Sequence, residues 1–203
     1  MKPAATYVFQ PVGEADLALL DCWRAKPHVA AWWGPPEIET PAEAFADPRV
    51  AMWIVMHDGR PFAYAQDYAP RDWDGHPFAH LPPGARGMDH YVGDADMLGR
   101  GHGSAFIRAH CRRLFAGGAP AIGVDPHPEN KRSIRAYEKA GFAVTSGPLD
   151  TRWGRAVLME QQPRATLRGQ CPAGDARGKL YATNWRTEES LIPASSGHGS
   201  GGA

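Results

Sequence analysis

The sequence predicts a mixed α/β fold, with strands and amphipathic helices alternating around one core. Three observations predict it. Short segments of period-two apolar alternation, typical of strands, are interspersed with segments whose apolar residues recur every three to four positions. Turn signals rich in glycine, proline and aspartate separate these segments. The chain has 203 residues, 43% of them hydrophobic and 22% charged, which is enough for one domain with a substantial core.

The first half of the chain is expected to supply three strands and two helices, followed by a long loop. These elements are expected at Tyr7–Val12, Glu14–Ala25, His28–Trp33, Val50–His57 and Phe62–Tyr68. Pro27 is expected to end the first helix, and Asp58-Gly59 is a strong hairpin signal between the last two strands. Residues 69–85 have no periodicity, which predicts a long loop of the kind that often forms a lid or a binding surface.

The second half is expected to alternate strands with helices and to end in a strand pair. Its elements are expected at Gly87–Val92, Gly101–Phe115, Ala121–Val124, Glu129–Ala140, Phe142–Thr145 and Ala156–Glu160. Gly117-Gly118 and Gly141 supply the stop signals of the two helices. Residues 1–162 therefore form the predicted domain. Residues 163–203 contain few aliphatic side chains, and we expect a disordered or non-native tail there.

Bulk properties narrow the class of protein. A formal net charge of zero argues against sequence-independent binding of nucleic acid, and no apolar run is long enough to span a membrane. The N-terminus lacks the apolar core of a signal peptide. The three cysteines include no Cys-x-x-Cys step, which favours a thiol-reduced compartment. We expect a cytoplasmic protein, a monomer or a homodimer, with no metal, nucleic-acid or membrane partner.

The charges are unevenly distributed along the chain. Residues 37–96 contain 11 acidic and 4 basic side chains, whereas residues 97–142 contain 8 basic and 3 acidic ones. If each segment forms one side of a cleft, one wall suits a cation and the other an anion. The alternative is an ordinary patchy surface, and charge alone does not decide between them.

A glycine-rich segment, Leu98–Ser104, lies between a predicted strand and a predicted helix. Glycines let the backbone approach a ligand closely, and the free N–H groups of a helix start bind phosphate. The segment lacks the Gly-Lys-Ser/Thr ending of a P-loop and the third glycine of a dinucleotide fingerprint. By itself it fits either an anion site or a structural turn.

A second motif follows about 30 residues later. Asn130 and Tyr137 are seven positions apart, which is two helical turns, so both lie on one helix face. A tyrosine hydroxyl at this place could protonate a leaving thiolate. The alternative interpretation is a tyrosine of the hydrophobic core.

Together the two motifs resemble those of the GCN5-related N-acetyltransferase (GNAT) superfamily, whose pattern is Arg/Gln-x-x-Gly-x-Gly/Ala, then Asn, then Tyr-x-x-x-Gly-Phe. Gly101, Gly103, Asn130 and the segment Tyr137–Phe142 match it, whereas Leu98 replaces the usual Arg or Gln. The resemblance covers roughly residues 6–160. It implies a central, mostly antiparallel sheet flanked by helices, in which two parallel strands ending near Val92 and Val124 splay apart.

The resemblance also implies acetyl-CoA as co-substrate, with its pyrophosphate on the glycine-rich loop and its pantetheine arm near Asn130. The implied cofactor-binding residues come from a strand end, the loop and the two helix starts. They are Tyr91, Val92, Leu98, Gly99, Arg100, Gly101, His102, Gly103, Ser104, Asn130 and Arg132. The side chains of His90 and His102 are interpreted as polar lining or surface.

Within the superfamily, the segments Trp32-Trp33-Gly34, Tyr64-Ala65-Gln66 and Arg86–Asp89 are similar to those of aminoglycoside 6′-N-acetyltransferases. Members of that group bind a cationic antibiotic through acidic residues and an aromatic side chain. The resemblance implies that Trp33, Gln66, Asp89 and Asp125 bind the substrate, and that Asp74 joins them if a one-residue gap is allowed in the long loop. The acidic stretch of the long loop adds Asp72 to the candidate substrate-binding residues. An acidic position near the last strand is replaced around Trp153, which leaves the substrate range open.

The residues agree with this chemistry independently. A protonated amine must be attracted and then deprotonated before it attacks a thioester, and carboxylates can do both. Asp89 is the candidate base and Tyr137 the candidate acid, whereas Asp67 and Asp72 fit a solvated surface equally well. We predict an acyltransferase that acetylates the 6′-amine of an aminoglycoside by direct transfer in a ternary complex. The alternatives are an enzyme of this fold that acylates a siderophore precursor, and a non-catalytic acyl-CoA-binding module.

Overall fold

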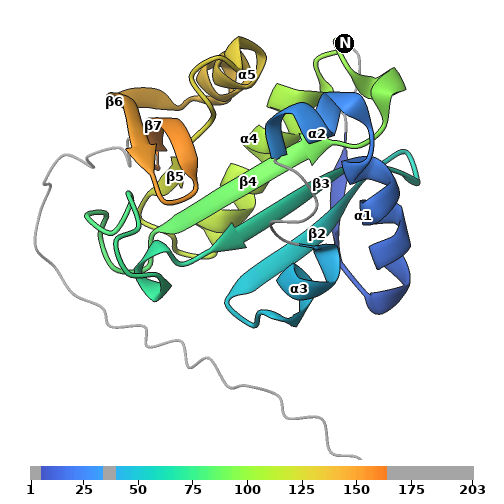
Figure 1. Cartoon of the computed structure of the whole chain (residues 1–203), viewed down its shortest axis with the longest axis horizontal. Coiled ribbons are helices and arrows are strands. Elements are labelled where there is room, and N and C mark those ends of the chain that lie inside the picture. The colour runs from blue at the N-terminus through green and yellow to red at the C-terminus, as the bar shows by residue number, and fades with distance from the viewer. Residues whose placement is uncertain (1–5, 34–39, 164–203) are drawn as a thin grey trace, which may run out of the picture. The chain divides into compact units, whose positions relative to one another are not determined.

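The computed structural model describes residues 6–33 and 40–163. In this part of the chain seven strands form one sheet in the order β1-β2-β3-β4-β5-β7-β6, and the β4–β5 pair is parallel while the others are antiparallel. Helices lie on both faces of the sheet (Figure 1). The predicted mixed α/β fold with a mostly antiparallel sheet is confirmed.

The strands follow the predicted segments closely. They are β1 (Tyr7–Pro11), β2 (Val50–His57), β3 (Arg60–Tyr68), β4 (Arg86–Val92), β5 (Ile122–Val124), β6 (Ala143–Thr151) and β7 (Gly154–Gln161). The predicted hairpin between β2 and β3 is confirmed, and Asp58 and Gly59 have φ angles of 49° and 74°. This left-handed pair suits a tight turn between twisted strands. β6 is longer than predicted, because most of it is exposed and shows no apolar alternation.

The helices are α1 (Leu17–Arg24), α2 (Pro27–Trp33), α3 (Pro41–Ala46), α4 (His102–Ala116) and α5 (Lys131–Ala140). Pro27 begins α2 rather than merely ending α1, which suits a residue whose missing N–H is harmless in a first turn. The helix α3 was not predicted. The signal for it is the capping box in which Thr40 Oγ1 accepts from the Glu43 N–H and Glu43 accepts from the Thr40 N–H.

Two apolar clusters cover the two faces of the sheet. On one face α4 and α5 pack through Phe106, Ile107 and Tyr137 onto strand residues such as Met88 and Ile122. The other face carries α1, α2 and α3 (Figure 1). Its cluster consists of Val12, Leu20, Trp23, Ala44, Met52, Ile54 and Tyr64. Each large side chain buried in this way contributes roughly 1.5–3 kcal/mol of stabilisation.

The two parallel strands, β4 and β5, separate soon after they meet. They pair only at Arg86 with Ile122 and at Gly87 with Gly123. Aromatic rings occupy the space beside both glycines, since an added Cβ would lie 2.4 Å from the Tyr68 ring at Gly87 and 2.6 Å from the Phe78 ring at Gly123. Beyond this join β4 and β5 diverge, which confirms the splayed strands implied by the resemblance.

Two further predictions concern the C-terminal tail and membrane-spanning helices. The predicted tail lies outside the described residues from position 164 onward, and the described residues all belong to one contact unit, Met1–Ala165. Among the described helices none combines the length and the apolar character needed to cross a bilayer.

Candidate active site

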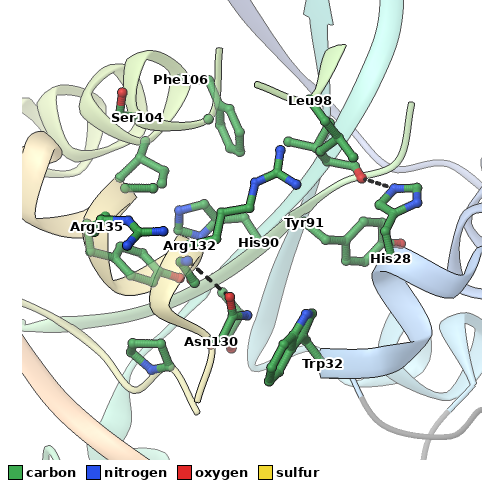
Figure 2. A pocket seen from close by; sticks show the side chains of 18 of the residues that line it. His28, Trp32, His90, Tyr91, Leu98, Ser104, Phe106, Asn130, Arg132 and Arg135 are labelled. Atoms are coloured by element: carbon green, nitrogen blue, oxygen red, sulfur yellow. Dashed lines mark hydrogen bonds between the residues drawn. The ribbon is translucent and has the colours of Figure 1, made fainter. Parts of the chain in front are cut away.

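A pocket of about 500 Å³ lies where β4 and β5 diverge. Its walls come from α2, the second half of β4, the glycine-rich loop with the start of α4, the β5–α5 loop and one side of α5 (Figure 2). The sequence segments that carry the two predicted motifs therefore line one space. This placement follows from the splay, because adjacent parallel strands that stayed paired would close the gap.

The glycine-rich loop presents bare backbone to the pocket. Gly99 and Gly101 have φ angles of 75° and 85°, and nothing lies within 4 Å of a Cβ built on Gly99, Gly101 or Gly103. Gly101 caps α4 without a side chain, and the helical hydrogen bonding begins with the Ala105 N–H to the Gly101 carbonyl. The first N–H groups of α4 therefore lack intrahelical partners. This open, donor-rich cradle fits a pyrophosphate group.

Basic side chains of α5 stand on the same side of the pocket. Arg132, Arg135 and Lys139 line it, at helical spacings of three and four residues. Asn130 caps α5 by accepting from the Ser133 N–H at 3.0 Å through its Oδ1 (Figure 2). This wall is suited to an anion, in agreement with the basic character of residues 97–142.

Two carboxylates face the pocket between its two sides. Asp89 accepts a hydrogen bond from Gln66 Nε2 at 3.0 Å, and Gln66 in turn accepts one from the Tyr64 hydroxyl at 2.7 Å. Burial, and then the charge of Asp89, raise the pKa of the neighbouring Tyr68 hydroxyl well above its usual value. Asp125 follows β5 directly, and burial raises its pKa to about 6. The hydrogen bond from the neutral Gln66 amide orients the Asp89 carboxylate, as a positioned base requires.

Tyr137 lies at the bottom of the pocket, on the face of α5 that meets the sheet. Its ring is buried and packs at right angles to the His90 ring, with the ring centroids 5.2 Å apart. Burial, and then the charges of Asp89 and Asp125, raise its pKa well above the usual value. The hydroxyl therefore keeps its proton near neutral pH.

Aromatic side chains of α2 form the opposite rim. Trp33 packs against Tyr91 and Tyr64, with centroids 4.8 and 5.6 Å away. The neighbouring Trp32 contacts the His127 ring of the β5–α5 loop at 5.9 Å. The helix is fixed to the end of β4, because His28 Nε2 donates to the Val92 carbonyl at 2.9 Å (Figure 2).

The structure does not bring every predicted site residue to the pocket. Asp72 and Asp74 are exposed in the long loop and are not among the pocket-lining residues. Arg100 and His102 also stand outside the lining, and the His102 ring instead hydrogen-bonds to the Tyr7 hydroxyl at 2.9 Å. Gln66 is not among the pocket-lining residues either, and it contacts the site through its hydrogen bond to Asp89. The remaining predicted residues line the pocket, and their roles stay predictions.

Several lining residues were not predicted. They include His28, Trp32, Arg135 and Lys139, and His90 was predicted only to be polar lining or surface. Arg135 and Lys139 carried a usable signal, because they repeat at helical spacing from the predicted Arg132. His28 had none, since its contact with the end of β4 joins segments more than 60 residues apart. Trp32 belongs to the Trp32-Trp33-Gly34 segment of the resemblance, from which only Trp33 was assigned to the site. Among the described residues, no group of three or more metal-ligating side chains stands together.

Comparisons with known proteins agree with this geometry. A family model described as an acetyltransferase (GNAT) domain matches residues 13–147. The chain therefore belongs to the GNAT acetyltransferase family.

Particular relatives are also similar. An aminoglycoside N(6′)-acetyltransferase type 1 of Klebsiella pneumoniae is 38% identical over 163 residues, covering 75% of this chain and 81% of the relative. The structure of AAC(6′)-Ib with paromomycin and acetyl-CoA superposes with a TM-score of 0.71 at 34% identity, covering 83% of this chain and 99% of that one. The structure of the same aminoglycoside acetyltransferase with coenzyme A and kanamycin gives a TM-score of 0.69 at 35% identity, covering 77% and 95%.

Proposed function

We propose that this protein transfers the acetyl group of acetyl-CoA to the 6′-amine of an aminoglycoside. The observation that carries the proposal is one pocket that is lined both by a donor-rich, basic wall and by two carboxylates. The first suits the phosphates of acetyl-CoA and the second a polycationic amine. The similar aminoglycoside N(6′)-acetyltransferase, and the similar structures that hold an aminoglycoside with acetyl-CoA or coenzyme A, support the same assignment.

Acetyl-CoA supplies an activated thioester when bound, and the residues of this chain would hold it at both ends. The backbone of Gly99–Ser104 would accept the pyrophosphate, with Arg132 adding positive charge. In the described part of the chain, no strand pairs with Tyr91 and Val92 on the β5 side of β4, so the backbone groups of this edge can bind the acyl-pantetheine arm.

The acceptor would enter from the side of α2, along Trp33. Asp89 takes a proton from the substrate ammonium, directly or through one water, and the freed nitrogen attacks the thioester carbonyl carbon. The new C–N bond replaces the C–S bond, and the sulfur leaves as a thiolate that takes the proton of the Tyr137 hydroxyl. The nitrogen loses its second proton as it becomes an amide, and that proton restores the Tyr137 hydroxyl. Asp125 would attract the substrate charge, while Asp72 and Asp74 could contact only the outer part of a long substrate.

A steady-state assay with kanamycin or tobramycin and acetyl-CoA tests the proposal. We expect CoA release that depends on the antibiotic, and a product carrying one acetyl group on the 6′-nitrogen by NMR. No release above the background rate would refute the function. Acetylation of only the side-chain amine of a hydroxylysine-type siderophore precursor would replace it with the alternative acceptor.

Replacing Tyr137 with phenylalanine is expected to lower kcat by about ten- to one hundred-fold, because the thiolate loses its proton donor. The KM for acetyl-CoA should change little, since the ring and its packing against His90 and Phe142 remain. Steady-state kinetics of the two proteins measure the effect. An unchanged kcat would remove the hydroxyl from the reaction.

Acceptor binding is expected to depend on pH through Asp125. Its raised pKa of about 6 means that the carboxyl is mostly neutral at pH 5 and mostly charged at pH 7. If only the charged form binds strongly, kanamycin affinity should rise about tenfold between these values. Calorimetric titration in the presence of CoA measures it. In Asp125→Asn this rise should disappear, and a rise of the same size would assign it to another group.

Two broader predictions accompany the function. We infer a cytoplasmic location, because the proposed co-substrate is a cytoplasmic metabolite. Size-exclusion chromatography with light scattering distinguishes the predicted monomer or homodimer from larger assemblies.

A further inference from the structure

His90 occupies a distinctive place in the pocket wall. It follows Asp89 on β4, and its side chain points to the opposite face of the sheet, since neighbouring strand residues alternate. There the imidazole stands between Phe106 and Tyr137, whose rings cross it at steep angles with centroids 5.3 and 5.2 Å away. Figure 2 shows His90 in the middle of the pocket wall, between the side chains of α4 and α5.

Both ring nitrogens of His90 are buried and have no hydrogen-bond partner among the described residues. The fully buried His110 differs in part, because its Nε2 lies 3.2 Å from Asp67 Oδ2, and only its Nδ1 has no partner among the described residues. A buried donor and acceptor without partners destabilise a folded protein, and such groups in a native structure need an explanation. A leucine at this position would avoid that cost, so the histidine points to a ligand.

The environment of His90 limits what this ligand group can be. Burial, with a smaller effect of His110, lowers the pKa of the imidazole to about 3, so the ring is neutral near pH 7. A neutral imidazole has one N–H donor and one acceptor nitrogen. It therefore matches a neutral amide or thioester and not a phosphate. The phosphates of acetyl-CoA already have binding groups in the proposed site, namely the start of α4 and the basic side chains of α5.

We propose that His90 binds the neutral acyl-pantetheine arm of acetyl-CoA, with one ring nitrogen donating to a carbonyl oxygen and the other accepting from an amide N–H. The proposal rests on the proposed function and adds a binding residue to its site. It places the arm beside the Tyr137 hydroxyl, because the two rings are in contact. His90 would thus hold the sulfur end of the co-substrate close to the proton donor.

The test compares His90→Leu, which removes both polar atoms, with His90→Gln, which keeps one donor and one acceptor. For His90→Leu we expect acetyl-CoA affinity, measured by calorimetry, to fall about five- to thirty-fold, as one or two hydrogen bonds are lost. The glutamine variant should recover most of it. Without ligand, His90→Leu should melt at the same temperature as the wild type or higher, whereas a residue needed only for folding would lower the melting temperature. If His90→Leu does not fold, the test uses His90→Phe instead, because phenylalanine keeps the ring packing.

A second ligand separates the arm from the phosphates. With S-acetyl-pantetheine, which lacks phosphates, kcat/KM of His90→Leu should fall by the same factor as with acetyl-CoA. Arg132→Gln should lose activity only with acetyl-CoA. Wild-type affinity in His90→Leu, or a defect that disappears with S-acetyl-pantetheine, would overturn this inference alone. If the wild type itself does not bind acetyl-CoA, the proposed function fails with it.

Discussion

Replacing Asp89 with asparagine is expected to lower kcat/KM for aminoglycoside acetylation by about 10²–10⁴-fold. The amide cannot accept the ammonium proton, and general-base catalysis typically contributes this much. The substitution preserves the shape of the side chain, so the contact with Gln66 Nε2 can persist. Initial rates at saturating acetyl-CoA, over a range of kanamycin concentrations, measure the loss.

The pH dependence provides the control for this role. As pH rises, more substrate amine is free without help, so the deficit of Asp89→Asn should shrink between pH 7 and pH 9. Asp96→Asn, at an exposed acid outside the pocket lining, changes the net charge equally and should keep wild-type kinetics. A deficit that stays constant with pH would indicate that Asp89 acts only as a counter-ion.

Replacing Asp67 with alanine is expected to lower the free energy of unfolding by about 3–5 kcal/mol, the usual cost of removing one partner of a buried ion pair. The carboxylate is 4% exposed. Asp67 Oδ1 accepts from Arg86 Nε at 3.0 Å, and Oδ2 accepts from Trp53 Nε1 at 2.8 Å and lies 3.2 Å from His110 Nε2. Without it, Arg86 keeps a partly buried charge and loses its partner. Urea unfolding followed by tryptophan fluorescence measures the change.

A second ion pair, Asp47 with Arg49, provides the control for this prediction. Asp47 contacts the guanidinium of Arg49, and the two side chains are 25% and 46% exposed, so Asp47→Ala should destabilise the protein much less than Asp67→Ala. At low pH, the loss of stability caused by Asp67→Ala should become smaller. Burial raises the pKa of its carboxyl, but the hydrogen bonds from His110 and Trp53 and the charge of Arg86 outweigh it and lower the pKa to about 2. The stabilisation is therefore complete above about pH 4 and is lost as pH falls towards 2. A difference independent of pH would contradict the ionic role.

Local patterns account for most of the fold. Strand alternation, helical spacing and the turn residues Asp58, Gly59 and Gly141 act within a few positions, so they located the hairpin and the ends of the helices. Segments whose sequence patterns are weak or mixed were harder to predict. The helix α3 has six residues and a short apolar face, and only its capping box marks it. Most of β6 is exposed at the sheet edge, so burial imposes no alternation on it.

The site was predictable where its residues belong to one local motif. Gly101, Gly103 and Tyr137 were found in this way, whereas the partners of each side chain were not. Asp67 is an instructive case, because its sequence neighbours suggested an acidic surface. Its partners Trp53, Arg86 and His110 come from three other elements, and they make it a buried structural acid. No spacing within one element reveals such a cluster.

The narrow join between β4 and β5 has a consequence for how the protein folds. Strands β1 to β4 pair in chain order, and β6 and β7 form a hairpin, so each half of the sheet can form from contacts between neighbouring strands. Two residue pairs then connect the halves. Because contacts between distant segments are slow to form, the β4–β5 pairing, called the seam here, should form after the strand pairs within each half. Amides near Gly87 and Gly123 should accordingly exchange with solvent before those at the centre of β2 and β3. The pocket exists only once the seam has closed, so the capacity to bind acetyl-CoA marks the final stage of folding.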